Sequence, residues 1–364
     1  MANDPGKRAS LTRIANELGV SAKTVSNAFN RPDQLSADLR VRILETARRL
    51  GYAGPDPLAR AFRMGRSDTV GVIYENGLSY AFDDPAAVTF LGGLAEVVEP
   101  VGMGLTLIPG SAAGYGEPGR IATSMIDGVV AYSLASDDPA LANVRDRKLP
   151  LVTVDQPRLS GVPWVGIDDE RAAAEVAEHL VSLGHRTVGI VSFGMNLAAD
   201  RGLHELGRLP PITLEVSARR MAGYARVLLA RPGAGPVPVV HMADSTETEG
   251  AQGARILLQN APDVTALICL SDRLAVGAYD ALRERGRAIP DDVAIVGFDD
   301  IALARHLVPP LTTVSQPHRE KGRLAGRALI SLLDGDPAPV GDPLPATLVA
   351  RASTAAHCAG ASWS

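Results

Sequence analysis

The sequence predicts an α/β protein, with a small all-α helix-turn-helix domain preceding a two-lobed domain built on doubly wound parallel sheets. Its 364 residues are too many for one compact domain and suit two or three. Residues 1–66 hold 12 Lys/Arg and 6 Asp/Glu, a formal charge of +6, whereas the remaining residues carry a charge of −11. From Thr69 onward, short apolar segments alternate with amphipathic ones, a pattern typical of parallel sheets covered by helices.

Composition excludes several classes of protein. Charged residues make up 21% of the chain and hydrophobic residues 46%, as in ordinary globular proteins. No apolar run approaches the roughly 20 residues of a membrane span, and the first ten residues lack the apolar core of a secretory signal. The two cysteines, Cys269 and Cys358, are too few for a disulfide framework or a cysteine-based metal site. We therefore expect a cytoplasmic protein without membrane contact.

Residues 10–53 are predicted to form three helices. Ser10 can cap a helix over 11–18 that stops at Gly19, and Ser21 can cap a second helix over 22–29. A third helix follows Ser36 and ends near residue 51. Two short helices joined by a tight turn with glycine form a helix-turn-helix, which places its second helix in the DNA major groove.

The outward face of the second helix distinguishes this interpretation from an ordinary three-helix bundle. Its side chains are small or able to form hydrogen bonds, which suits entry into a groove and contact with base edges. The predicted DNA-binding residues of this helix and its cap are Ser21, Ala22, Lys23, Thr24, Ser26 and Asn27.

Residues 54–66 are predicted to form a hinge helix and linker. Asp56 and Pro57 favour a helix start and Gly65 an end, but two turns are too short to be stable alone in water. A segment that folds against DNA, with arginines on phosphates and an apolar wedge in the minor groove, has this composition. The expected contacts are Arg60, Phe62 and Arg63. A solvated linker between domains is the alternative.

Residues 67–356 are predicted to form two similar lobes. The first series of apolar strands is TVGVIY, GLTLIP, DGVVAYS and LPLVTVD, and the second is TVGIVSF, PVPVVHM, TALICLS and VAIVGFD. Helices are expected near 86–100, 138–148, 169–183, 217–230, 246–259 and 273–285. Ligands of such folds bind at the carboxyl ends of the strands.

Polar residues at these strand ends are candidate ligand contacts. Asp155, Asp299 and Ser271 each follow a strand, and Arg220 lies near the start of a helix. Arginine donates a planar fork and aspartate accepts from hydroxyls, so the group suits a ligand that is rich in hydroxyls or carries a carboxylate. A role in helix capping or in bridging the lobes is the alternative for each residue.

The segments LTRIANELGVSAKTVSNAFN, ARRLGY and PLARAFRMGRSDTVGVIY resemble the lactose-repressor (LacI/GalR) family of transcription regulators, and the likeness extends from about Leu11 to Thr354. The resemblance implies a homodimer on a near-palindromic double-stranded DNA operator, with paired hinge helices at its centre. It places Ala22, Lys23 and Asn27 at base-reading positions. Phe62 stands where the family usually has a leucine wedge.

The resemblance also implies a periplasmic-binding-protein-like effector domain. Lobe one is expected at about 67–157 plus 300–327, and lobe two at about 158–299 plus 328–356, with crossings near 156–161, 299–302 and 314–316. Matching effector-binding positions are Asp155, Arg220, Ser271, Asp299 and Gln316. Tyr80, Phe82 and Asp83 either line the cleft or form a hydrophobic plug at the dimer face. Where the family often has an aromatic on the ligand, this chain has Ser245 or Thr246.

These observations predict a ligand-responsive transcriptional regulator, a repressor controlled by a small-molecule effector such as a sugar or sugar-like metabolite. It is expected to be cytoplasmic and nucleoid-associated and to use no cofactor or metal. The alternative is a sugar-binding protein of transport or sensing type that does not regulate DNA. An enzyme would need an activated nucleophile or an acid–base pair, and no motif of that kind is recognisable in the sequence.

Overall fold

The computed structural model describes residues 10–54, 65–75, 77–110, 119–194, 202–338 and 341–357. The chain divides into two compact units between Asp68 and Thr69. Among the described residues, none of the helices combines the length and apolarity needed to cross a membrane.

The N-terminal unit is a helical bundle of α1 (Leu11–Leu18), α2 (Ala22–Asn30), the 3-10 helix η1 (Pro32–Gln34) and α3 (Ala37–Arg49). The hydroxyls of Ser10, Ser21 and Ser36 accept backbone N–H groups at the three α-helix starts. Gly19 ends α1 with a φ of 66°, a left-handed conformation that glycine adopts without strain. The core of the unit consists of Ile14, Ala15, Val25, Ala28, Ile43 and Ala47.

Lobe one of the second unit contains a parallel sheet in the order β2-β1-β3-β4-β5. Its strands are β1 (Thr69–Tyr74), β2 (Gly104–Pro109), β3 (Gly128–Tyr132), β4 (Leu151–Val154) and β5 (Trp164–Val165). Helices α6 (Pro85–Val98) and α13 (His318–Asp334) share one core with the sheet, while α7 (Gly119–Thr123) and α8 (Pro139–Asp146) contribute to another. The short helix α5 (Tyr80–Asp83) precedes α6.

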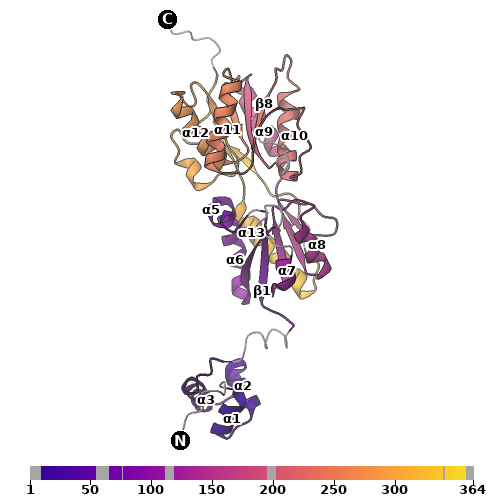
Figure 1. Cartoon of the computed structure of the whole chain (residues 1–364), viewed down its shortest axis with the longest axis vertical. Coiled ribbons are helices and arrows are strands. Elements are labelled where there is room, and N and C mark those ends of the chain that lie inside the picture. The colour runs from indigo at the N-terminus through magenta and orange to yellow at the C-terminus, as the bar shows by residue number, and fades with distance from the viewer. Residues whose placement is uncertain are drawn as a thin grey trace. The chain divides into compact units, whose positions relative to one another are not determined.

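Lobe two contains a sheet in the order β10-β9-β6-β8-β7, in which only the edge strand β7 is antiparallel to its neighbour. Its strands are β6 (Val188–Phe193), β7 (Gly202–Glu205), β8 (Pro238–Met242), β9 (Ala266–Cys269) and β10 (Ala294–Val296). The pair α9 (Asp169–Ser182) and α10 (Glu215–Leu228) and the pair α11 (Glu247–Asn260) and α12 (Asp272–Glu284) flank the sheet (Figure 1). The antiparallel pair β11 (Thr313–Ser315) and β12 (Thr347–Val349) completes the domain.

The division between the lobes differs from the expected boundaries. Residues 164–165 pair with β4, so the first crossing lies after residue 165 rather than at 156–161. Ile301, Ala304 and Leu311 belong to the core of lobe two, although 300–327 was expected in lobe one. Helix α13 packs on α6 through residue 329 and beyond, so lobe one does not end at 327. Amphipathic helices and strands carry no sequence mark of the sheet on which they pack, and the packing therefore decides.

Close approach of α6 and α13 fixes the start of α13. A Cβ atom added to Gly93 would lie 1.9 Å from the Arg319 carbonyl oxygen, and one added to Gly322 would lie 2.1 Å from the Phe90 carbonyl oxygen. Side chains at either position would push the helices apart. The first turn of α13, which carries His318 and Lys321, is therefore held firmly on lobe one.

Candidate functional site

A cavity of about 230 Å³ lies between the two lobes of the second unit. Strands from both sheets end at this cavity. Glu75 follows β1, Asp155 follows β4, Ser245 lies beyond β8 and Asp299 follows β10. The lobes thus present the carboxyl ends of their parallel strands to one another, which is where open α/β folds bind ligands.

Arg220 of α10 forms the lobe-two wall of the cavity. Its Nε donates to Asp169 Oδ1 at 2.9 Å, and its Nη1 donates to the Leu270 carbonyl oxygen at 2.7 Å. The guanidinium also stacks 3.6 Å from the ring centroid of Phe298. Arg220 and Asp169 are 5% and 2% exposed, so the ion pair is buried. These contacts engage two of the three guanidinium nitrogens and fix the plane of the group.

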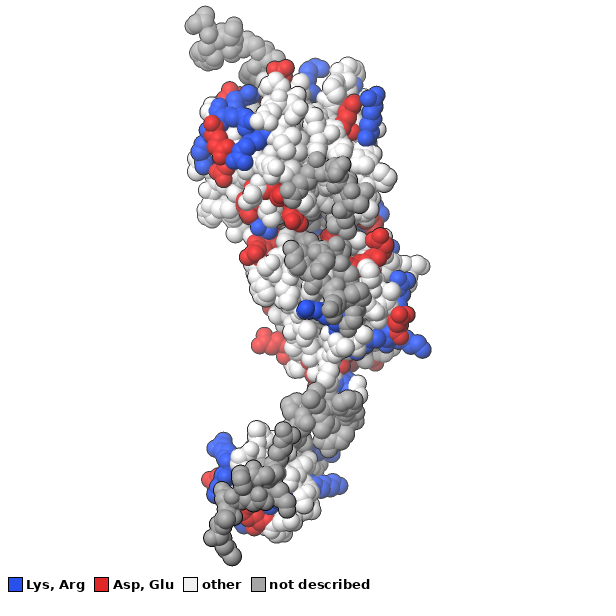
Figure 2. All heavy atoms as spheres, viewed as in Figure 1, with Lys and Arg blue, Asp and Glu red and all other residues white. Residues whose placement is uncertain are grey.

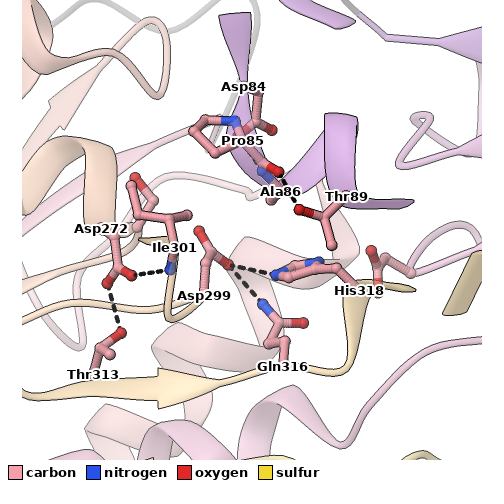
Figure 3. Close-up of polar contacts among 12 residues, drawn as sticks. Asp84, Pro85, Ala86, Thr89, Asp272, Asp299, Ile301, Thr313, Gln316 and His318 are labelled. Carbon is pink, nitrogen blue, oxygen red and sulfur yellow. Dashed lines mark hydrogen bonds and ion pairs between the residues drawn. The ribbon is translucent and has the colours of Figure 1, made fainter. Parts of the chain in front are cut away.

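Asp299, beyond β10 of the same lobe, accepts a hydrogen bond from Gln316 Nε2 at 2.7 Å. Figure 3 shows Asp299 reaching toward Gln316 and His318, with the start of α6 at Asp84 to Ala86 nearby. Burial raises the pKa of Asp299 well above its ordinary value, although Arg220 opposes this shift. The backbone of Asp299 has a φ of 123°, an uncommon conformation for a residue other than glycine and one that tends to occur at functional sites.

His318 begins α13 and is a polar cavity residue that sequence reasoning missed. Its side chain is buried, and neither ring nitrogen has a hydrogen-bond partner among the described residues. The Nε2 atom lies 3.9 Å from Asp299 Oδ1, too far for a hydrogen bond. Burial and the nearby Lys321 ammonium lower the pKa of His318 to about 3, so the ring is neutral at physiological pH. A neutral imidazole offers a ligand one donor and one acceptor.

Glu75 adds an acidic wall from lobe one. Burial, together with Asp138 and Asp244, raises the pKa of Glu75 to about 8. Its Oε1 atom is buried and has no hydrogen-bond partner among the described residues. A carboxyl group with this pKa is largely protonated at neutral pH and can therefore donate a hydrogen bond.

Arg273 of α12 approaches lobe one beside the cavity. It forms a two-pronged ion pair with Glu247, with both N···O distances at 2.9 Å, and its guanidinium lies 6.0 Å from the ring centroid of Tyr80. Tyr80 forms a side-chain hydrogen bond with Asp84, whose pKa is raised by burial. Arg273, Tyr80 and Asp84 together connect helix α12 of lobe two with the start of α6 in lobe one.

The structure separates the expected effector contacts into two groups. Tyr80, Asp155, Arg220, Asp299 and Gln316 line the cavity. Ser271 is not part of the described lining, and its hydroxyl accepts the Leu274 N–H as the cap of α12. That hydroxyl also lies 2.6 Å from the hydroxyl of Ser245, which does line the cavity. Phe82 is 67% exposed and is not part of the described lining, and Asp83 borders a separate surface opening instead.

Other residues lining the cavity could not be identified from the sequence pattern. Asp84 caps α6 and accepts the Ala86 N–H, and Gln156 accepts the Val216 N–H at 2.8 Å. Both have ordinary roles in capping or bridging, so nothing in the sequence marks them as cavity residues. Glu75 could have been found from the sequence, because it is a polar residue directly after the apolar strand β1.

In the N-terminal unit, helix α2 presents the predicted DNA-binding residues. Ala22 and Lys23 are exposed, while Ser26 and Asn27 are half-buried. Ser21 caps the helix and its hydroxyl lies 2.8 Å from the Thr24 hydroxyl. Figure 2 shows Lys and Arg side chains projecting from this unit. Arg60, Phe62 and Arg63 lie outside the described residues.

Comparison with known proteins extends these findings. Residues 177–354 match the model of a periplasmic binding protein-like domain. A helix-turn-helix transcriptional regulator of Mycobacterium tuberculosis is 43% identical, covering 91% of this chain and 92% of the relative. A LacI-family regulator structure from Corynebacterium glutamicum has a TM-score of 0.70 at 36% identity, covering 94% and 98% of the two chains. A structure of the regulator CelR with cellobiose has a TM-score of 0.66 at 29% identity, covering 95% and 100%.

A helix-turn-helix unit joined to a two-lobed domain with a polar cavity between its lobes defines a ligand-responsive transcriptional regulator, not an enzyme. The extent of the similarity shows that the chain belongs to the lactose-repressor (LacI/GalR) family.

Proposed function

We propose that the interlobe cavity binds an uncharged, hydroxyl-rich metabolite such as a sugar. The carrying observation is the composition of the cavity wall: among the described residues, five carboxyl groups line it, against the single guanidinium of Arg220. The carboxyl groups belong to Glu75, Asp84, Asp155, Asp244 and Asp299. Ionised carboxylates accept hydrogen bonds from hydroxyls and repel phosphates and carboxylates. Carboxyl groups with raised pKa values, such as those of Glu75 and Asp299, can also donate hydrogen bonds to hydroxyls and supply no positive charge for an anion. The sequence alone also allowed a ligand with a carboxylate, and the excess of carboxyl groups over basic groups in the lining argues against one.

The size of the cavity supports a small ligand. A volume of about 230 Å³ lies below the roughly 300–1,000 Å³ of most ligand pockets. A single-ring metabolite fits this volume better than a disaccharide does. The CelR–cellobiose complex supports a carbohydrate class for the related fold, while its disaccharide differs from the ligand proposed here.

We propose that the effector controls DNA binding by the N-terminal unit, which binds a near-palindromic operator as part of a homodimer. The bound protein would repress transcription in the cytoplasm, at the nucleoid. One helix-turn-helix reads too few base pairs for useful specificity, whereas a two-fold dimer matches a palindrome. Ser21, Ala22, Lys23, Thr24, Ser26 and Asn27 would contact the major groove. In this proposal, Arg60 and Arg63 bind phosphates and Phe62 enters the minor groove at the operator centre.

Selection of binding sites from random double-stranded DNA, followed by a thermal-shift screen of neutral sugars against their phosphates and acids, tests the proposal. We expect an enriched palindrome, and a neutral sugar that both stabilises the protein and changes its affinity for that site. If a sugar binds but no DNA sequence is enriched, the chain is a sugar-binding protein of sensing type. If only phosphorylated or acidic compounds bind, the proposed ligand class is wrong.

Sedimentation tests the dimer separately. A fragment beginning at Ser67 keeps the whole second unit and should sediment as a dimer at micromolar concentration. A monomeric fragment would place the contacts between subunits elsewhere in the chain or on the DNA.

A further inference from the structure

The carboxamide of Asn27 on helix α2 has a protein partner next to the predicted DNA-contacting face. Its Nδ2 atom donates to the Oε1 atom of Gln34 at 3.2 Å. Gln34 is exposed and lies at the end of η1, directly after α2. Sequence reasoning did not single out Gln34, because seven residues and a helix end separate it from Asn27.

Gln34 lies on a well-supported piece of backbone. Its N–H donates to the Arg31 carbonyl oxygen at 3.1 Å, which closes the turn after α2. The next residue, Leu35, packs against the core of the unit, and Ser36 caps α3. The backbone from which the Gln34 side chain projects is therefore supported on both sides, and its oxygen accepts the hydrogen bond from Asn27.

The hydrogen bond decides which amide atoms of Asn27 remain available. Gln34 takes one of the two Nδ2 hydrogens, and the described residues offer no further hydrogen bond to this amide. The second Nδ2 hydrogen and Oδ1 stay free. One donor beside one acceptor complements adenine in the major groove, where N7 accepts and the N6 amino group donates. Fixing the amide before binding also lowers the entropy cost of ordering it on DNA.

We propose that Gln34 is a positioning residue that orients the Asn27 carboxamide for recognition of an A·T base pair in each operator half-site. This inference rests on the proposed reading of DNA by α2. It assigns Gln34 a role that acts through Asn27 and requires no base contact of its own.

The test compares the sequence preferences of full-length variants by selection from random double-stranded DNA. The wild-type protein should enrich a site with an A·T pair that Asn27→Ala no longer selects, a loss of discrimination of about tenfold at that position. Gln34→Ala should weaken the preference at the same base pair and leave the others unchanged. A purely structural role would instead lower affinity for all sequences evenly.

Gln34→Glu provides the conservative variant, because its carboxylate oxygen can still accept from Asn27 Nδ2. We expect it to keep the A·T preference while binding all DNA more weakly, since it adds a negative charge near the phosphates. The exposed neighbour Asp33 supplies the control, and Asp33→Ala should retain the wild-type preference at this base pair.

Three results would overturn the inference: an unchanged preference in Gln34→Ala, a change at a base pair that Asn27→Ala does not affect, or loss of the A·T preference in Gln34→Glu. The second would show that Gln34 reads a base itself. The proposed function fails in a different way, because the wild-type protein would then enrich no sequence at all, and the inference would fall with it.

Discussion

The Lys321 ammonium lies 2.5 Å from Asp155 Oδ1 and 2.6 Å from Gln316 Oε1, and the lysine side chain is fully buried. Gln316 in turn donates to Asp299. A single cation on α13 thereby connects the strand end of lobe one to the strand end of lobe two, through two residues of the cavity wall. The backbone of Asp155 has a φ of 61°, which is uncommon for a residue other than glycine. Its carboxylate is held by the contact with Lys321.

Lys321→Met should destabilise the protein strongly, because it leaves the largely buried Asp155 carboxylate without its cation. Loss of one partner of a buried ion pair costs about 3–5 kcal/mol. Urea unfolding at pH 7 measures the change in the free energy of unfolding. Adding Asp155→Asn to Lys321→Met should recover much of the loss, since no charge is then left unpaired. Equal destabilisation of the single and double variants would show that packing of the lysine stem, and not the charge pair, matters.

Arg220→Ala should abolish the effect of a neutral-sugar effector on operator affinity, because a ligand shifts an equilibrium only through contacts that differ between the two states. It should also lower the stability of the second unit, since Asp169 is left buried and unpaired. Arg219→Ala is the matched control, because Arg219 pairs with Glu215 in a partly exposed position. Titration of labelled operator with and without effector gives the answer. A normal effector response in Arg220→Ala would remove this residue from the site.

Glu75 should make the protein less stable as the pH rises. The folded-state pKa of about 8 lies above the ordinary value of 4.5, so the folded protein holds a proton that the unfolded chain has lost between these values. The stability contributed by this proton is fully present below about pH 4.5 and is lost as the pH rises through 8. Unfolding free energies measured from pH 5 to 8.5 should fall less in Glu75→Gln than in the wild type. The exposed Glu99 offers a control, and Glu99→Gln should leave the slope unchanged.

His318 should make the protein less stable as the pH falls, opposite to the effect of Glu75. Its folded-state pKa of about 3 lies below the ordinary 6.5, so the neutral ring stabilises the fold above pH 6.5, and this contribution is lost as the pH falls toward 3. His318→Phe should remove this acid sensitivity. It should also keep or raise the free energy of unfolding at pH 7, by about 1 kcal/mol, since two unpartnered nitrogens are no longer buried.

The same variant should bind the effector more weakly, because the imidazole donor and acceptor are lost from the cavity. A thermal-shift titration shows this as a smaller ligand-induced shift. Unaltered ligand affinity in His318→Phe would mean that the ring only fills space. His306→Phe, at an exposed position, controls for the added apolar surface.

The sequence by itself determined the local structure. Serine caps, glycine stops and helical spacing of apolar residues predicted the helices over 11–18 and 22–29, which agree with α1 and α2 to within one residue. Apolar runs such as TVGVIY and GLTLIP coincide with β1 and β2. These features depend on neighbours in the chain, and the sequence records such neighbours directly. Strand ends also drew attention to Asp155 and Asp299, since each follows a strand of its own sheet, at the carboxyl edge where such folds bind ligands.

Only the tertiary structure decided which residues meet across the lobes. Lys321 lies 166 positions from Asp155, and Asp169 lies 51 positions from Arg220, and no local pattern connects either pair. Ser271 follows a strand as expected, yet helix capping and contact with Ser245 place it behind the cavity wall. The division of the chain between the lobes was settled in the same way, because an apolar stripe shows that a helix is covered without showing by which sheet. Burial, charge pairing and the cavity itself arise when distant segments pack together, and that information exists only in three dimensions.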